Sequence, residues 1–171
     1  MRRVFGAAAI LFGSFLWALC RQRAAAGRID MLRALSQSLL ELRSALQEQR
    51  RPLGEVFSRL AEKNAQEDAG AFYETLRRRM DALGERSFSQ IWREAVEAEI
   101  RPRDFTAADV LRPLGALLGG SELDGQCAAL ERAARRIEQE ADARREALRA
   151  GKKLSFGLSL SAGAFLAIIL M

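Results

Sequence analysis

Residues 32–46 read LRALSQSLLELRSAL, and this stretch decides the fold class. Five of its six leucines, at positions 32, 35, 39, 42 and 46, follow one another at steps of 3, 4, 3 and 4 residues. That spacing places all five on one stripe of an α-helix. The helix should end near Arg50, because Pro52 follows and proline suits the first position of a new helix.

The same spacing recurs near the other end of the chain. Apolar residues step by 4, 3, 4, 3 and 4 through Leu123, Cys127, Leu130, Ala134, Ile137 and Ala141, and Leu148 continues the phase. This pattern predicts a long final helix that runs to Lys153 and projects past a compact bundle toward a membrane.

Shorter helices are expected between these two. The predicted inner faces are Leu53, Val56, Phe57 and Leu60 for one helix, and Phe72, Leu76, Met80 and Leu83 for the next, with Gly84 as its stop. Three capping boxes then predict helix starts, at Ser87 with Gln90, Thr106 with Asp109, and Ser121 with Asp124. The Thr106 helix should run through Leu118, and Gly119-Gly120 should form the turn before the last helix.

No convincing alternation of apolar and polar residues, the mark of a half-buried strand, occurs between residues 21 and 153. We therefore predict an all-α protein, an antiparallel bundle of about six helices in a single domain. A length of about 130 residues suits one core and is too short for two.

The two ends of the chain are apolar. Residues 4–20 carry no charge, and neither do residues 154–171. Leu19 and Trp17 fit a signal-peptidase site badly, and Leu19 also fits poorly before a lipoprotein cysteine at Cys20, so an uncleaved anchor is favoured. We thus expect an N-terminal transmembrane anchor at 1–20, a helical bundle at 21–153 and a C-terminal transmembrane helix at 154–171.

Orientation follows from the basic residues beside the second span, since positive flanks stay in the cytoplasm. The basic residues on its N-terminal side are Arg144, Arg145, Arg149, Lys152 and Lys153, and none follows it. The bundle is therefore predicted to be cytoplasmic, with both termini outside.

The composition offers little for catalysis. The chain has no histidine and only two cysteines, Cys20 and Cys127, which lie far apart, so neither a metal site nor a disulfide scaffold is expected. Residues 115–120 lack the Lys-Ser/Thr of a nucleotide-binding loop. We expect no catalytic residue, cofactor or metal.

The charges of the bundle argue against a nucleic-acid partner. Residues 21–153 hold 25 of the 27 Lys and Arg and all 22 Asp and Glu, a net charge of only +3 with the two signs interleaved. One compact basic triplet, Arg77, Arg78 and Arg79, is a candidate docking site for an acidic partner. Its alternative interpretation is an ordinary solvated helix face.

One segment carries a family resemblance. Residues 111–126, LRPLGALLGGSELDGQ, resemble the signature of the stage III sporulation protein AB family. The resemblance extends to residues 52–55, to the helix that contains Trp92, to the charged final helix and to the apolar tail. Its signature residues, for which a structural role is expected, are Leu111, Leu114, Gly115, Leu118, Gly119, Asp124 and Gln126.

The resemblance implies a membrane protein on the mother-cell side of the outer forespore membrane, within the channel complex that joins mother cell and forespore. It also implies a bundle similar to the cytoplasmic domain of the F-type platform protein of type II secretion and type IV pilus systems. By that analogy, the bundle would bind the secretion-type ATPase of the complex, stage III sporulation protein AA.

Two alternatives remain at this stage. A membrane-tethered regulatory or sensor module unrelated to secretion fits the same bundle, and an enzyme with an unfamiliar site is the weaker one. The sequence also leaves open whether the apolar stripes pack internally or against a second copy of the chain.

Overall fold

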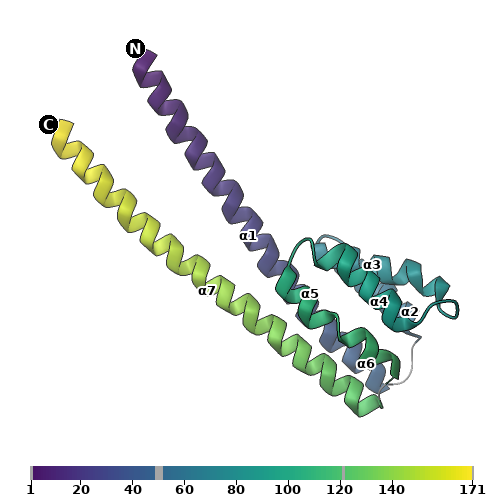
Figure 1. Cartoon of the computed structure of the whole chain (residues 1–171). Helices are drawn as coiled ribbons and strands as arrows, with labels where there is room; N and C mark the ends of the chain where they lie inside the picture. The colour runs from purple at the N-terminus through teal and green to yellow at the C-terminus, as the bar shows by residue number, and fades with distance from the viewer. Residues whose placement is uncertain (1, 49–51, 121, 171) are drawn as a thin grey trace.

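The computed structural model describes the backbone of residues 2–48, 52–120 and 122–170, and side chains within 23–48, 52–120 and 122–150. Over these residues the protein is all-α, as predicted, with no named strand (Figure 1). A 3₁₀ turn at Met80–Ala82 follows α3, and a π-helical turn at Val96–Ile100 follows α4. The α-helices are α1 (Arg2–Glu48), α2 (Leu53–Lys63), α3 (Asp68–Arg79), α4 (Phe88–Ala95), α5 (Phe105–Leu111), α6 (Leu114–Gly120) and α7 (Leu123–Leu170).

The two long helices, α1 and α7, pack against each other in antiparallel orientation (Figure 1). Four residues of the predicted leucine stripe on α1, Leu32, Leu35, Leu39 and Leu42, are fully buried. The facing stripe of α7 is built from Leu130 and Ile137 with small alanines between them, which lets the two backbones approach closely. Burial of each large apolar side chain contributes roughly 1.5–3 kcal/mol before entropy costs.

Polar contacts across this pair define its register. Arg33 Nη2 donates to Asp142 Oδ1 at 3.0 Å, and Arg43 Nη1 lies 3.5 Å from Glu131 Oε2. Between them, the buried Ser36 hydroxyl donates to the carbonyl of Ala134 at 3.0 Å. The two helices run antiparallel, so the same register can be extended along both of them. It places the inner ends of the apolar segments, near residues 20 and 154, at about the same height along the helix pair.

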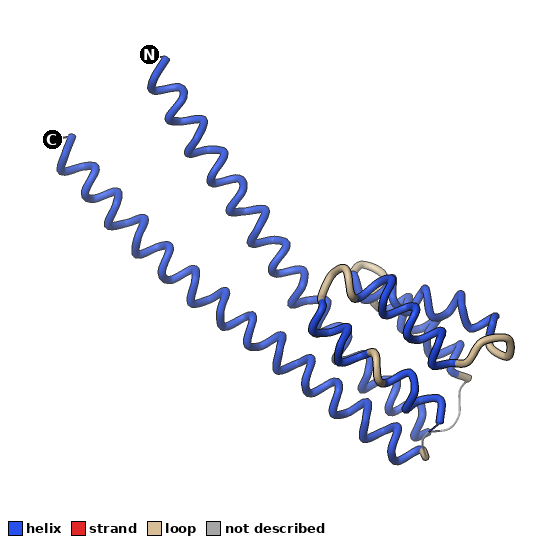
Figure 2. Tube along the Cα trace, in the orientation of Figure 1, coloured by secondary structure: helices blue, strands red, loops and turns tan. Residues whose placement is uncertain are grey.

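The shorter helices form a second layer against the α1–α7 pair (Figure 2). Helices α2 and α3 make a hairpin, α4 packs on α3 and α6, and α5 and α6 lie along α7. Trp92 on α4 is fully buried at the centre of this layer. Its ring meets Phe72 edge-on with 5.2 Å between centroids, and its Nε1 donates to the carbonyl of Leu111 at 2.8 Å.

Gly115 is what allows α6 to approach this tryptophan. A Cβ atom built on Gly115 would lie 2.9 Å from the Cβ of Trp92, well inside ordinary van der Waals contact. Gly119, one turn later on the same helix, has no comparable neighbour, since its Cβ would meet only Phe88 at 3.9 Å. The glycine at 115 is therefore a packing requirement.

Two of the three predicted capping boxes lie on described residues, and one of these is confirmed. Ser87 accepts from Gln90 N, while the Gln90 side chain accepts from Ser87 N. The box at Thr106 was wrong: Asp104 is the N-cap of α5 and accepts from Ala107 N at 2.9 Å. Ser121, of the third box, lies outside the described residues.

Other helix boundaries also differ from the predictions. The expected helix through Thr106 and Leu118 breaks at Arg112-Pro113, because proline lacks the N–H that would continue it. The described part of the bundle therefore contains seven α-helical segments in place of about six. Gly119 and Gly120 belong to α6 and do not form a turn, and Pro52 is the N-cap of α2 rather than its first residue.

The predicted membrane spans, 1–20 and 154–171, continue α1 and α7 as helix without a break over residues 2–20 and 154–170, and both project from the bundle toward the same side (Figure 1). Their side chains lie outside the described residues. Within the described part of the chain, no helix has a stretch long and apolar enough to cross a membrane.

The Gly115 contact generates a stability prediction. We expect Gly115→Ala to lower the free energy of unfolding by about 1–3 kcal/mol, because the added methyl overpacks against Trp92. Gly119→Ala is the matched control, and should be neutral or stabilising by up to about 1 kcal/mol. Urea unfolding of fragment 21–153, which contains the whole described core, followed by circular dichroism, measures both. Equal effects of the two substitutions would contradict the close approach at Gly115.

The Asp104 cap generates a second prediction. The Asp104 side chain is 2% exposed and also pairs with Arg144, whose guanidinium pKa it raises through that hydrogen bond. Asp104→Ala removes both the cap and the ion pair, and should cost about 2–3 kcal/mol of unfolding free energy. Asp104→Asn keeps a capping oxygen and should cost less.

Thr106→Ala is the control for this experiment, and its expected effect is within about 0.5 kcal/mol. The same urea titration applies to all three variants. A cost for Thr106→Ala as large as that for Asp104→Ala would assign the cap to Thr106 after all.

Candidate protein interface

The arginine triplet predicted as a docking site lies in the last turn of α3. Arg77 is exposed and makes a bidentate contact with Glu74, with Nε–Oε2 and Nη2–Oε1 distances of 2.8 and 2.6 Å. Arg78 lies farther from the same carboxylate, 3.6 Å from Nε to Oε1, and its side chain is 66% exposed. Arg79 turns instead toward α4 and donates from Nη1 to Glu94 Oε2 at 2.6 Å.

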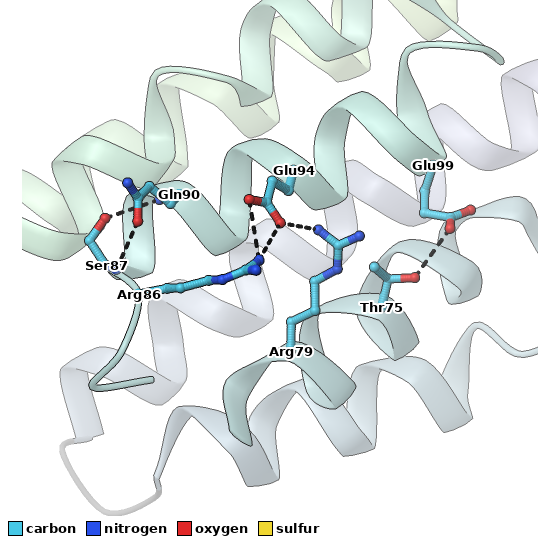
Figure 3. A network of polar contacts seen from close by, with 7 residues as sticks. All are labelled: Thr75, Arg79, Arg86, Ser87, Gln90, Glu94 and Glu99. Atoms are coloured by element: carbon cyan, nitrogen blue, oxygen red, sulfur yellow. Dashed lines mark hydrogen bonds and ion pairs between the residues drawn. The ribbon is translucent and has the colours of Figure 1, made fainter. Parts of the chain in front are cut away.

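A fourth arginine joins the triplet in space. Arg86, in the turn before α4, donates to the same Glu94 carboxylate at 3.2 Å, so Glu94 lies between Arg79 and Arg86 (Figure 3). Sequence reasoning missed both Arg86 and Glu94, because the contact depends on how the α3–α4 turn folds back.

Acidic side chains balance the arginines at this surface. The hydrogen bond from Arg77 lowers the pKa of Glu74 and, reciprocally, raises the pKa of Arg77. The four guanidinium groups pair with the carboxylates of Glu74 and Glu94, and two further acids, Asp81 and Glu85, lie in the turn between α3 and α4. Arg78 is the least engaged of the four, with the longest contact and a largely exposed side chain.

An exposed leucine interrupts this charged surface. Leu83 was predicted on the inner face of the third helix, and that prediction was wrong: its side chain is 50% exposed. The α-helix ends at Arg79, and Gly84 turns the chain with a φ of 120°, so Leu83 falls outside the helical stripe. We name Arg77, Arg78, Arg79, Leu83 and Arg86 together the distal patch.

The distal patch lies at the end of the bundle away from both chain termini (Figure 2). The turn that carries it leads into Phe88, whose side chain lies beside Gly119 in the last turn of α6. That turn of α6 is followed directly by the start of α7.

The family-signature residues divide between the core and this same end. Leu111, Leu114 and Gly115 are buried, Leu118 is half-buried, and Gly119 and Asp124 are exposed. The Gln126 side chain on α7 donates from Nε2 to the carbonyl of Leu118 at 3.1 Å, which satisfies one free carbonyl in the last turn of α6. The structural role of the signature residues stays a prediction.

Catalytic and metal-binding arrangements were not expected. In the portion of the chain that the structure describes, no three Cys, Asp or Glu side chains converge as metal ligands would. Cys127 is buried as a free thiol on α7. The surface features that remain are charged patches and exposed apolar side chains, which are typical of protein interfaces.

Comparison with known proteins gives one match. The family model for stage III sporulation protein AB matches residues 3–171. No curated protein and no solved structure matches the chain. The match covers nearly every residue, so the chain belongs to the stage III sporulation protein AB family, whose role is in sporulation.

Proposed function

We propose that this protein is a membrane-anchored platform component of a secretion-like sporulation complex, and that its helical bundle docks a secretion-type ATPase. The observation that carries the proposal is the antiparallel α1–α7 pair, whose ends continue as the two uncharged segments 4–20 and 154–171. Because both segments leave the same end of the bundle, one bilayer can hold both of them.

Such an arrangement gives the bundle a defined orientation. Two anchors restrain rotation and tilt more than one would, so the opposite end of the bundle is presented away from the membrane. The basic residues that precede the second span place the bundle in the cytoplasm under this proposal, on the mother-cell side of the outer forespore membrane. A cytoplasmic ATPase would then approach the far end.

The distal patch is the docking surface that we propose for this ATPase. It combines a half-exposed Leu83 with the largely exposed Arg78, and arginine beside an apolar residue is typical of interface centres. An acidic surface with an apolar contact point on the ATPase would complement it. Nucleotide hydrolysis would take place in the ATPase, and the bundle would supply a rigid contact.

A membrane-tethered regulatory module with no ATPase partner is the alternative. It predicts the same anchors and bundle but gives no role to the exposed distal patch. Gene neighbourhood separates the two hypotheses at little cost, since a platform component should be encoded beside an ATPase and other small membrane proteins.

Charge reversal in the distal patch tests the docking proposal. We expect fragment 21–153 to bind the purified ATPase, and Arg78→Glu to weaken binding by about tenfold, or roughly 1.4 kcal/mol, because it places a carboxylate against an acidic partner. Arg132→Glu on α7 is the matched control: Arg132 is also exposed and has no ion pair among the described residues. Isothermal titration with and without nucleotide measures the affinities.

The outcomes separate the hypotheses. A folded fragment with no detectable affinity in either nucleotide state would reject direct docking and favour the regulatory module. Binding that both charge reversals weaken equally would keep the ATPase as partner but move the contact away from the distal patch.

A further inference from the structure

The loop at the opposite end of the bundle, residues 101–105, exposes an aromatic side chain that the fold does not use. Phe105 is the first residue of α5, and its side chain is 59% exposed, more than any other large apolar residue of the described core and surface. The guanidinium of Arg101 lies over its ring, 4.8 Å from the centroid. Neither the packing of the bundle nor the proposed ATPase contact explains this exposure.

The backbone that precedes Phe105 is held firmly in place. The π-helical turn Val96–Ile100 widens the end of α4, and its last bond joins Arg101 N to Val96 O at 3.0 Å. Glu99, in the same turn, accepts from Thr75 at 3.2 Å (Figure 3). It also pairs with Arg103. Asp104 is then buried as the α5 cap. Phe105 is therefore displayed from an ordered loop.

Phe105 lies at the level where the two long helices leave the bundle. It lines an open recess together with Ala24 and Ala25 of α1 and with Ala147 and Leu148 of α7. At 1.5 Å per residue, Ala24 is about 6 Å from the apolar segment that ends at Cys20, and Leu148 is about 9 Å from the one that begins at Leu154. The headgroup layer of a bilayer is roughly 5–8 Å thick on each side.

The charges at this end differ from those at the distal patch. Four exposed arginines on the last described turns, Arg23, Arg28, Arg145 and Arg149, have no ion pair among the described residues. Arg28 lines the same recess as Phe105. The unpaired acids on the same turns are Asp30 and Glu146, so this end of the α1–α7 pair carries an excess of positive charge.

We infer that the 101–105 loop is a third membrane contact, in which Phe105 enters the interface of an anionic bilayer while Arg28 and its unpaired neighbours bind lipid phosphates. This inference rests on the proposed anchoring by segments 4–20 and 154–171. An aromatic ring with an apolar body suits the headgroup layer, and each arginine near an anionic surface strengthens attachment. Arg101, over the ring, stays within reach of the same phosphates.

The contact gives the bundle a fixed tilt. Two helices alone form a line of attachment about which the bundle can rock, whereas a third point off that line defines a plane. The loop stands beside the α1–α7 pair at the end of the second layer (Figure 1). It therefore orients the distal patch with respect to the membrane.

The test uses the full-length chain in vesicles, with Cys20→Ala and Cys127→Ala as background. An environment-sensitive fluorophore is attached at Thr106→Cys, beside Phe105, or at Glu85→Cys, beside Leu83 in the distal patch. The vesicles contain phosphatidylcholine alone or equal parts of phosphatidylcholine and phosphatidylglycerol, each with a headgroup-nitroxide lipid as quencher. We expect quenching at position 106, stronger in the anionic vesicles, and none at position 85.

Two substitutions test the residues involved. Phe105→Ser should reduce quenching at position 106 toward the level seen at position 85, and Leu83→Ser, which removes a similarly exposed apolar side chain, should not. Arg28→Gln should lower the equilibrium constant for contact between the loop and the anionic vesicles by about fivefold. Quenching at 106 that is insensitive to both Phe105→Ser and Arg28→Gln overturns the inference.

The remaining outcomes separate this inference from the anchoring proposal. Chain that stays in the vesicles after an alkaline wash but shows no quenching at position 106 rejects the third contact alone. Equal quenching in neutral and anionic vesicles rejects the preference for an anionic surface, and with it the role of Arg28 and its unpaired neighbours. Chain that the alkaline wash removes rejects the membrane anchors, and with them the third contact.

Discussion

The antiparallel packing of α1 on α7 is the interaction on which the rest of this structure depends. Leucines of one helix fill the spaces beside alanines of the other, and the polar contacts of Arg33, Ser36 and Arg43 along the seam define one register. A one-turn slip would separate these partners and misalign the stripes. The α2–α3 hairpin packs against α1, α5 and α6 pack against α7, and α4 packs on α3 and α6.

The α1–α7 pairing also determines where the two apolar ends of the chain leave the bundle. Since the chain enters through α1 and leaves through α7, both apolar ends emerge on one side, and everything between them is built outward from that side. The second layer then has two unlike ends. At one, arginines of the distal patch are largely engaged with Glu74 and Glu94. At the other, Arg28 lines the same recess as Phe105, and Arg23, Arg145 and Arg149 on the nearby turns of α1 and α7 have no ion pair among the described residues.

Trp92 lies at the centre of the second layer. Its ring contacts Phe72 of α3, its indole N–H is bonded to the end of α5, and Gly115 brings α6 against it. A single buried side chain thus sets the distances among four helices, because interiors packed to crystal-like density cannot absorb a shift at one of them. Two family-signature residues, Leu111 and Gly115, are located at these contacts.

The sequence by itself determined the fold class, the long helical stripes and the Ser87 capping box, because these depend on spacings within a few residues along the chain. Tertiary structure decided what depends on contacts between distant segments. Asp104 and not Thr106 caps α5, because burial and Arg144 hold that carboxylate in place. Leu83 faces solvent because the α3 helix stops short of it. Arg86 joins the Arg77–Arg79 triplet, and Phe105 reaches the level of the helix exits, only because turns bring segments far apart in the chain together, and no local pattern of side chains encodes that proximity.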